Sequence, residues 1–181
     1  DKIADIAALK GKRVATGRGW NAQYLLAVAL QDAGLNYKDI TPAYVNNAAA
    51  AVAALHSGSV QAVTLWDPFL AAAESQPGLK NLRDGSGLSN NRTFYLSTAR
   101  YADEHRALLK TFFAELGKVS QWANAKPAEV AALLAPQLGI SANVLEVASE
   151  RRNYNAVAIT PQIIAEQQKL ADTFQGLGLI P

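Results

Sequence analysis

The chain has 181 residues, of which 50% are hydrophobic and 18% are charged, with a net charge of +2 at neutral pH. This composition supports one ordinary domain or two small ones and excludes wholesale disorder. Cysteine and methionine are both absent, which excludes thiolate metal sites, disulfides and thiol nucleophiles. No apolar run approaches the ~20 residues that span a bilayer, and no basic cluster favours nucleic acid as a partner. Because the chain begins with Asp1, we expect a processed protein or a fragment.

The first half of the chain alternates short apolar runs with helical patterns. The apolar runs predict strands at 13–16, 40–46, 60–66, 79–83 and 93–98. Helical spacing between them predicts helices at 21–33, 47–56 and 69–74. In the third of these helices we expect Asp67 to cap and Pro68 to take the first helical position. Strands that alternate with helices at this pitch predict an α/β fold with a mostly parallel sheet.

The second half is different, because its apolar residues recur at helical spacing alone. The predicted helices are 106–123, 127–137, 142–151 and 161–170. Four helices after a small sheet indicate a second lobe, or part of one.

The first strand-to-helix turn, GRGWNA at residues 17–22, matches a weak dinucleotide-binding pattern. A dinucleotide site also needs an acidic residue at the end of the next strand, where this chain has Tyr44, Val45 and Asn46. The pattern therefore favours a glycine turn that opens into a helix N-terminus, which suits a small anion. Asn21 either caps this helix, which is the commoner role, or donates its amide outward.

Two further turns end predicted strands in the same way, at Asn46-Asn47 and at Trp66-Asp67. Ligands of open parallel sheets bind outside the carboxyl ends of the strands, so the three turns are the candidate site. Trp66 is equally compatible with core packing and with lining a cleft, whereas an N-cap is favoured over a ligand role for Asp67. Amides, backbone N–H groups and indoles recognise ligands rather than catalyse reactions.

We expect no catalytic residue and no metal site. His56 falls at a helix C-terminus and His105 in a solvated helix start, without partners at metal-ligand spacing. Ser86, Ser89 and Ser97 lack the surroundings of a nucleophile elbow.

Several segments together, in order and spacing, resemble one protein family over about residues 3–181. They are 9–15 (LKGKRVA), 24–26 (YLL), 33–35 (AGL), 65–73 (LWDPFLAAA), 84–88 (DGSGL), 94–96 (FYL), 133–139 (LLAPQLG) and 171–174 (ADTF). The chain resembles the periplasmic substrate-binding proteins of ABC importers for aliphatic sulfonates, taurine and nitrate. This resemblance implies a periplasmic binding protein-like (type II) fold, in which two α/β lobes close over the ligand.

Members of that family are longer, so the resemblance implies that the N-terminal part is missing. Residues 1–98 are then a complete ligand-binding lobe that ends in the return crossing strand. Residues 99–181 are the helical C-terminal part of the other, incomplete lobe. We expect those helices to expose apolar faces, which invite dimerisation or exchange of elements between chains.

The resemblance also implies a function. An extracytoplasmic protein, periplasmic or lipid-anchored in a Gram-positive source, captures a small organic anion and delivers it to permease subunits in the inner membrane. The anion is a sulfonate or a similar compound, and no cofactor is implied. The expected ligand-binding residues are Gly19, Trp20, Asn21, Ala22, Asn46, Asn47, Trp66 and Asp67.

Trp20 and the Asn46-Asn47 pair depart from the family pattern, which leaves the ligand open. An alternative is an enzyme of the same fold that acts on a sulfur compound or a thiamine pyrimidine precursor. Relatives of that kind use cysteine chemistry, which this chain lacks. A third hypothesis, a protein-interaction module, predicts no small-molecule binding.

Overall fold

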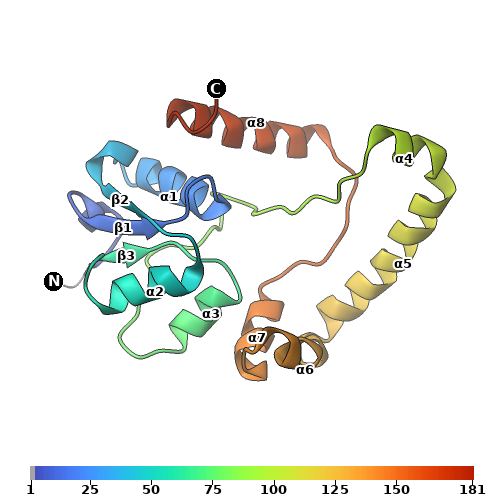
Figure 1. Ribbon diagram of the computed structural model, residues 1–181, viewed down its shortest axis with the longest axis horizontal. Helices are drawn as coiled ribbons and strands as arrows, with labels where there is room; N and C mark the ends of the chain where they lie inside the picture. The colour runs from blue at the N-terminus through green and yellow to red at the C-terminus, as the bar shows by residue number, and fades with distance from the viewer. Residues whose placement is uncertain (1–2) are drawn as a thin grey trace. The chain divides into compact units, whose positions relative to one another are not determined.

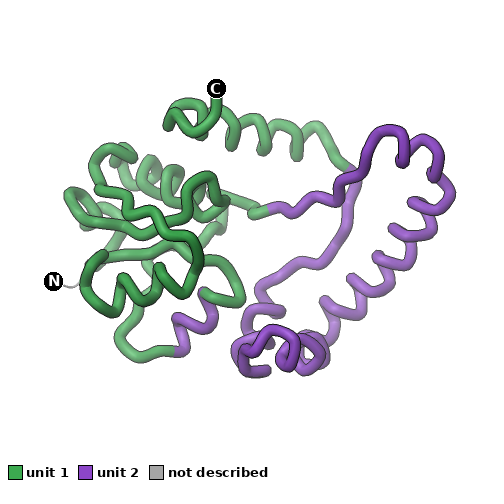
Figure 2. The backbone as a smooth tube through the Cα atoms, in the orientation of Figure 1, with its two compact units in different colours: residues 1–69, 76–91, 159–181 green, residues 70–75, 92–158 purple. Residues whose placement is uncertain are grey.

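The computed structural model describes residues 3–181, which form two compact units (Figure 2). The sheet unit consists of the chain up to residue 69 together with 76–91 and 159–181. The helical unit consists of residues 70–75 and 92–158. These units are defined by contacts within this chain, and they place residues 159–181 with the sheet. The lobe boundary expected at residue 98 stays a prediction.

The sheet has three parallel strands in the order β2-β1-β3 (Figure 1). They are β1 (Arg13–Thr16), β2 (Thr41–Tyr44) and β3 (Ala62–Val63). Arg13 pairs with Thr41 at the start of β1, and Ala15 pairs with Val63 on the other side. Both are parallel pairings, so the predicted α/β fold with a mostly parallel sheet is confirmed.

Helices cover both faces of this sheet because successive residues of β1 point to opposite sides. On one face Val14 packs with Leu26 and Leu30 of α1 (Asn21–Asp32). On the other face Ala15 packs with Ala51 of α2 (Ala48–His56). The sheet unit is thus a three-layer sandwich.

The last helix of the chain belongs to the same unit. Helix α8 (Pro161–Gly176) packs on the outer side of α1 (Figure 1). The rings of Phe174 and Tyr24 meet edge to face there, with 6.3 Å between their centres. It is longer than the predicted helix 161–170, and the side chain of Thr160 caps its N-terminus by accepting from the N–H of Ile163.

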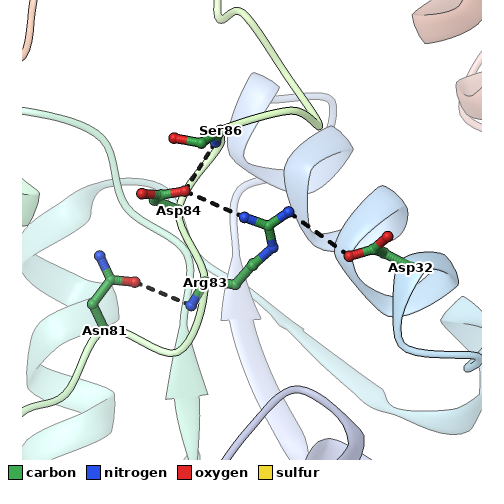
Figure 3. A network of polar contacts seen from close by, with 5 residues as sticks. All are labelled: Asp32, Asn81, Arg83, Asp84 and Ser86. Carbon is green, nitrogen blue, oxygen red and sulfur yellow. Dashed lines mark hydrogen bonds and ion pairs between the residues drawn. The ribbon is translucent and has the colours of Figure 1, made fainter.

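The predicted strand at 79–83 is wrong, since this segment is irregular. Side-chain contacts hold it instead (Figure 3). The guanidinium of Arg83 reaches Asp84 at 3.4 Å and Asp32, at the end of α1, at 3.8 Å. The N–H of Ser86 donates to Asp84 Oδ1 at 2.9 Å, and hydrogen bonds from Ser86 hold the pKa of Asp84 below its usual value. Polar contacts of this kind fix a loop without a neighbouring strand.

The predicted strand at 93–98 is also wrong. Its residues form no ladder, and Tyr95 and Leu96 are 60% and 91% exposed. Strand propensity marks residues that suit a pleated, half-buried surface. No neighbouring strand within residues 3–181 offers that surface to the segment, so the propensity is not realised.

The helical unit contains α4 (Ala99–Glu104), α5 (Arg106–Ala125), α6 (Pro127–Leu138) and α7 (Ala142–Glu150). The last three agree with the predicted helices to within two residues at each end, whereas α4 was not predicted. Local signals set the ends of α6, with proline at its first position and Gly139 at φ +66° as its C-cap. Short α3 (Phe69–Glu74) follows β3, as expected.

Much of the apolar surface of the helical unit is exposed. Its large exposed apolar residues include Tyr95, Leu96, Leu108, Phe112, Phe113, Val119, Leu133, Leu138 and Val157. Many of its buried positions are small, as at Ser120, Ala123 and Ala131. Among the described residues, no helix is both long and apolar enough to cross a membrane.

Candidate functional site

Three turns follow the carboxyl ends of the three parallel strands. Pairing continues to these ends, because Val45 N–H donates to Thr16 O and Thr64 N–H donates to Ala15 O, both at 3.0 Å. Parallel strands end at one edge of their sheet, and β1 lies between the other two. The turns 17–20, 45–47 and 64–68 therefore share an edge, which brings together the expected site residues of the sheet unit.

The turn after β1 depends on two glycines for different reasons. Gly19 has φ +75°, a conformation that glycine adopts without strain. Gly17 provides space, because a Cβ there would lie 1.9 Å from the indole of Trp20. The indole thus folds back over the backbone of Gly17. Trp20 is the N-cap residue of α1 and makes no side-chain capping hydrogen bond.

Trp20 belongs to a chain of aromatic rings. Its ring meets that of Trp66 edge to face, with 5.0 Å between the ring centres. The ring of Trp66 meets that of Phe69 in the same way, with 5.6 Å between the centres. Trp66 is half-buried, so its ring packs against neighbours and still presents surface. This arrangement joins the turn after β1 to the turn after β3.

Asp67 and Pro68 lie in the turn that links Trp66 to α3, and the peptide between them is cis. The helix begins only at Phe69. The expectation that Pro68 takes the first helical position is therefore wrong. A cis peptide belongs to a turn rather than to a helix.

Asn21 and Asn47 have different roles. Asn47 is the N-cap of α2, since its Oδ1 accepts the N–H of Ala50 at 2.8 Å. Asn21 is the first helical residue of α1, and its Nδ2 donates to Asn91 Oδ1 at 2.8 Å. Asn21 is therefore not the cap of α1, and an outward amide that meets a ligand stays a prediction. Asn46 is exposed beside Asn47.

Sequence reasoning missed Asn91, which lies 70 residues from its partner. It also missed the hydroxyl pair at the strand ends, in which Thr64 Oγ1 donates to the buried Thr16 Oγ1 at 2.8 Å. Neither pair leaves a local signal in the sequence.

Gln23 is among the positions that match the family's anion-binding helix start, but the role of its side chain was not predicted. Its side chain is fully buried, and its Oε1 accepts the N–H of Gly19 at 2.7 Å. Its Nε2 donates to the hydroxyls of Tyr37 at 3.0 Å and Tyr44 at 3.3 Å. Burial raises the pKa of Tyr37 to about 12, so this hydroxyl stays protonated at neutral pH. The sequence signal was incomplete, because glutamine at the third helical position is one half of a capping box and the N-cap residue here is Trp20.

The electrostatics of the turn favour an anion. Gln23 and Tyr24 both donate their N–H groups to Trp20 O. By contrast, the N–H groups of Asn21 and Ala22 have no acceptor within residues 3–181. They carry the positive end of the α1 dipole. The guanidinium of Arg18 adds a positive charge, held 5.8 Å from the ring centre of Tyr44.

The described residues contain no group of three or more histidine, aspartate or glutamate side chains that could hold a metal ion. His56 ends α2, and His105 lies between α4 and α5 with its ring 4.4 Å from that of Tyr101. A surface hollow in the helical unit is lined by Ala102, Arg106, Leu109, Lys110 and Phe113, none of which is an expected site residue.

Comparisons with known proteins agree with this architecture. A protein of Escherichia coli K12 named for binding aliphatic sulfonates is 33% identical over 180 residues, which is 99% of this chain and 56% of the relative. A second such protein, from Bacillus subtilis, is 28% identical over 171 residues. The chain thus spans about half the length of these curated relatives.

Solved structures match over the whole chain. The periplasmic aliphatic sulphonate binding protein SsuA of E. coli has a TM-score of 0.92 at 33% identity, with 62% of its own length covered. SsuA of Xanthomonas axonopodis pv. citri, bound to MOPS, has a TM-score of 0.86 at 32% identity, with 63% covered. A DszB mutant in complex with biphenyl-2-sulfinic acid shares the fold at 15% identity and a TM-score of 0.68.

A family model ties these matches together. The model for OpuAC, the substrate-binding domain of ABC-type glycine betaine transport systems, matches residues 1–158. On this match and on the likeness to the SsuA proteins, the chain belongs to the OpuAC family of substrate-binding domains of ABC-type transporters.

Proposed function

We propose that the protein is the extracytoplasmic substrate-binding component of an ABC importer for a small organic anion of the sulfonate type. The observation that carries this proposal is a pair of N–H groups at the start of α1, those of Asn21 and Ala22, which have no acceptor among residues 3–181 and lie next to Trp20 and Trp66. The likeness to sulfonate-binding relatives supports the choice of anion.

In this proposal the sulfonate oxygens accept hydrogen bonds from the N–H groups of Asn21 and Ala22. The α1 dipole and the charge of Arg18 favour the negative group. One hydrogen of Asn21 Nδ2 bonds Asn91, and the second can donate to the ligand. The indoles of Trp20 and Trp66 contact the organic part and exclude water from it.

Lobe closure and delivery to a permease complete the proposed transport function. Residues 1–98 contribute one ligand-binding lobe and residues 99–181 belong to the other, with closure of the lobes around the anion. The loaded protein then delivers the anion to a permease from the periplasm, or from the outer face of a Gram-positive membrane. Exposed apolar side chains of α5 and α6 are the surface through which chains would dimerise or exchange elements.

We propose binding without catalysis. The groups gathered at the site are amides, backbone N–H groups, hydroxyls and indoles, together with the single carboxylate of Asp67 and the guanidinium of Arg18. None of these is a poised acid–base pair. Chromatography of a sulfonate incubated with the protein measures whether the compound is consumed. Consumption would contradict the proposal and favour the enzyme alternative.

The test is thermal unfolding of the chain with a panel of alkanesulfonates, arenesulfonates, taurine, nitrate and sulfate. A ligand at a thousand times its Kd adds about 4 kcal/mol to the free energy of unfolding. For a chain of this size, that raises Tm by roughly 8–16 °C. A rise confined to sulfonates is the expected result, and no rise with any anion would overturn the proposal.

A variant tests the site itself. Asn21→Ala should weaken sulfonate binding by about 1–3 kcal/mol, because it removes an amide donor next to the anion. Asn143→Ala is the matched control, since Asn143 is an exposed residue in the first turn of α7 in the other unit. Equal affinities of the two variants would remove the Asn21 side chain, though not its backbone N–H, from the site.

A further inference from the structure

We propose that Gln23 is the positioning residue of the anion site: it does not contact the ligand but holds the turn 17–20 in the shape that binds it. This inference rests on the proposed function. In this proposal the N–H of Gly19 is used within the protein, whereas the N–H groups of Asn21 and Ala22 are left for the ligand.

The buried side-chain amide of Gln23 is fully hydrogen-bonded. Gln23 has no exposed surface, and its side chain makes three hydrogen bonds, one through Oε1 and two through Nε2. A buried amide with these partners has one orientation, because turning it over would set Nε2 against the Gly19 N–H donor. The side chain is therefore a rigid link.

The Gln23 side chain connects the turn after β1 to the neighbouring strand. At one end Oε1 holds the N–H of Gly19. At the other end Nε2 is anchored to Tyr37, in the short helix Tyr37–Asp39 before β2, and to Tyr44, the last residue of β2. The ring of Tyr44 also holds Arg18. The turn after β1 is thus fixed to the neighbouring strand by side chains as well as by the sheet.

The backbone N–H groups of the turn are not all available to a ligand. The N–H of Gly19 points to Gln23 inside the protein, so it is withdrawn from the ligand. Gly19 then serves the site through its positive φ, and the donors left for the anion are the N–H groups of Asn21 and Ala22. Fixing Gly19 also fixes Trp20, whose indole lies over Gly17.

The experiment compares Gln23→Met with Tyr37→Phe in the full chain. Methionine has similar length and volume but makes none of the three hydrogen bonds, whereas Tyr37→Phe removes one anchor and leaves the Gly19 contact. The probes are benzenesulfonate and ethanesulfonate, titrated calorimetrically well below the Tm of each variant. We expect Gln23→Met to raise Kd about 10-fold or more through misplacement of the turn. Tyr37→Phe should change Kd less than about 3-fold.

A purely structural role would lower Tm in Gln23→Met while leaving the Kd of the folded protein unchanged. That result, an unchanged Kd, overturns the inference. A loss of affinity in Gln23→Met alone supports it.

A second readout needs no ligand. Hydrogen exchange by NMR should show the Gly19 amide protected in the wild-type chain and unprotected in Gln23→Met. Wild-type exchange at the rate of an unstructured peptide overturns the inference, and this measurement stands even where Gln23→Met fails to fold. If the wild-type chain binds neither sulfonate, the proposed function fails, while Gly19 exchange still decides whether Gln23 holds the turn.

Discussion

The sheet unit and the helical unit differ in how far their apolar residues find partners. The sheet unit contains three clusters of buried residues, centred on Leu30, on Ala15 and on the Tyr24–Phe174 contact. In the helical unit, Leu133 is 59% exposed and Leu108 is 55% exposed. Both units have regular helices, so the presence of a helix does not show that its apolar side chains are buried. A helix forms from local signals, whereas a core needs a second surface.

The largest effect should separate the two units directly. Leu30→Ala should lower the free energy of unfolding by about 2–5 kcal/mol, since Leu30 is 0% exposed in the core of α1. Leu133→Ala should change it by less than about 0.5 kcal/mol, because that side chain lies at the surface. Urea denaturation followed by circular dichroism measures both. Equal losses would break the comparison by indicating that α6 buries its apolar face in solution.

A smaller effect should mark the candidate site within the sheet unit. Gly17→Ala should cost about 1–3 kcal/mol, because the new Cβ would overlap the indole of Trp20 and force it to move. Urea denaturation measures the loss, and near-ultraviolet circular dichroism should change as the Trp20–Trp66 pair separates. A variant with wild-type stability and spectrum would mean that the indole does not lie over Gly17.

A glycine-to-alanine substitution in the helical unit should stabilise the protein, whereas Gly17→Ala destabilises it. Gly117 lies inside α5, and a Cβ there would meet nothing within 4 Å. Gly117→Ala should therefore raise the free energy of unfolding by about 0.5–1 kcal/mol through helix propensity. Thermal melts of this variant and of Gly17→Ala, run side by side, test the pair. Destabilisation by Gly117→Ala would reveal a neighbour packed closely against α5.

The last effect should be confined to high pH and absent at neutral pH. The pKa of Tyr37 is about 12 in the folded protein, mainly through burial, against 10.0 for an unperturbed tyrosine. Below pH 10 both states keep the proton, so the stability that this group contributes is fully present there. Between pH 10 and 12 the unfolded state loses its proton first, and stability falls.

Phenolate absorbance should show one tyrosine that titrates near pH 12, and Tyr37→Phe should remove that step. The variant should also lose less stability than the wild type between pH 10 and 12. A wild-type titration without a late step would show that Tyr37 is accessible to solvent in the sheet unit.

Much of the fold could be predicted because its signals are local. Pro127 and Gly139 delimit α6, which agrees with the predicted helix 127–137 to within one residue, and Asn47, predicted as the start of the second helix, is its N-cap. The two strand predictions that failed, 79–83 and 93–98, depended on a partner that a propensity cannot supply. The first is held by the contacts of Arg83 instead (Figure 3).

The candidate site was predictable to the level of its turns. Glycine positions and helix starts gave residues 17–22, 46–47 and 66–67. The partners of those residues were not predictable, since Asn91 meets Asn21 across 70 residues and Tyr44 meets Gln23 across 21. A hydrogen bond between distant residues depends on how the chain folds back, and no periodicity records it.

The sequence by itself therefore determined the parallel α/β pattern, most helix boundaries and the glycine turn that opens α1. These features follow from backbone preferences and from side chains a few residues apart. Only the tertiary structure decided that Gln23 Nε2 reaches Tyr37 and Tyr44, that Trp20 meets Trp66, and that Asn21 meets Asn91. The reason is physical, because these contacts join separate elements whose spacing is set by the packing of the sheet and its helices.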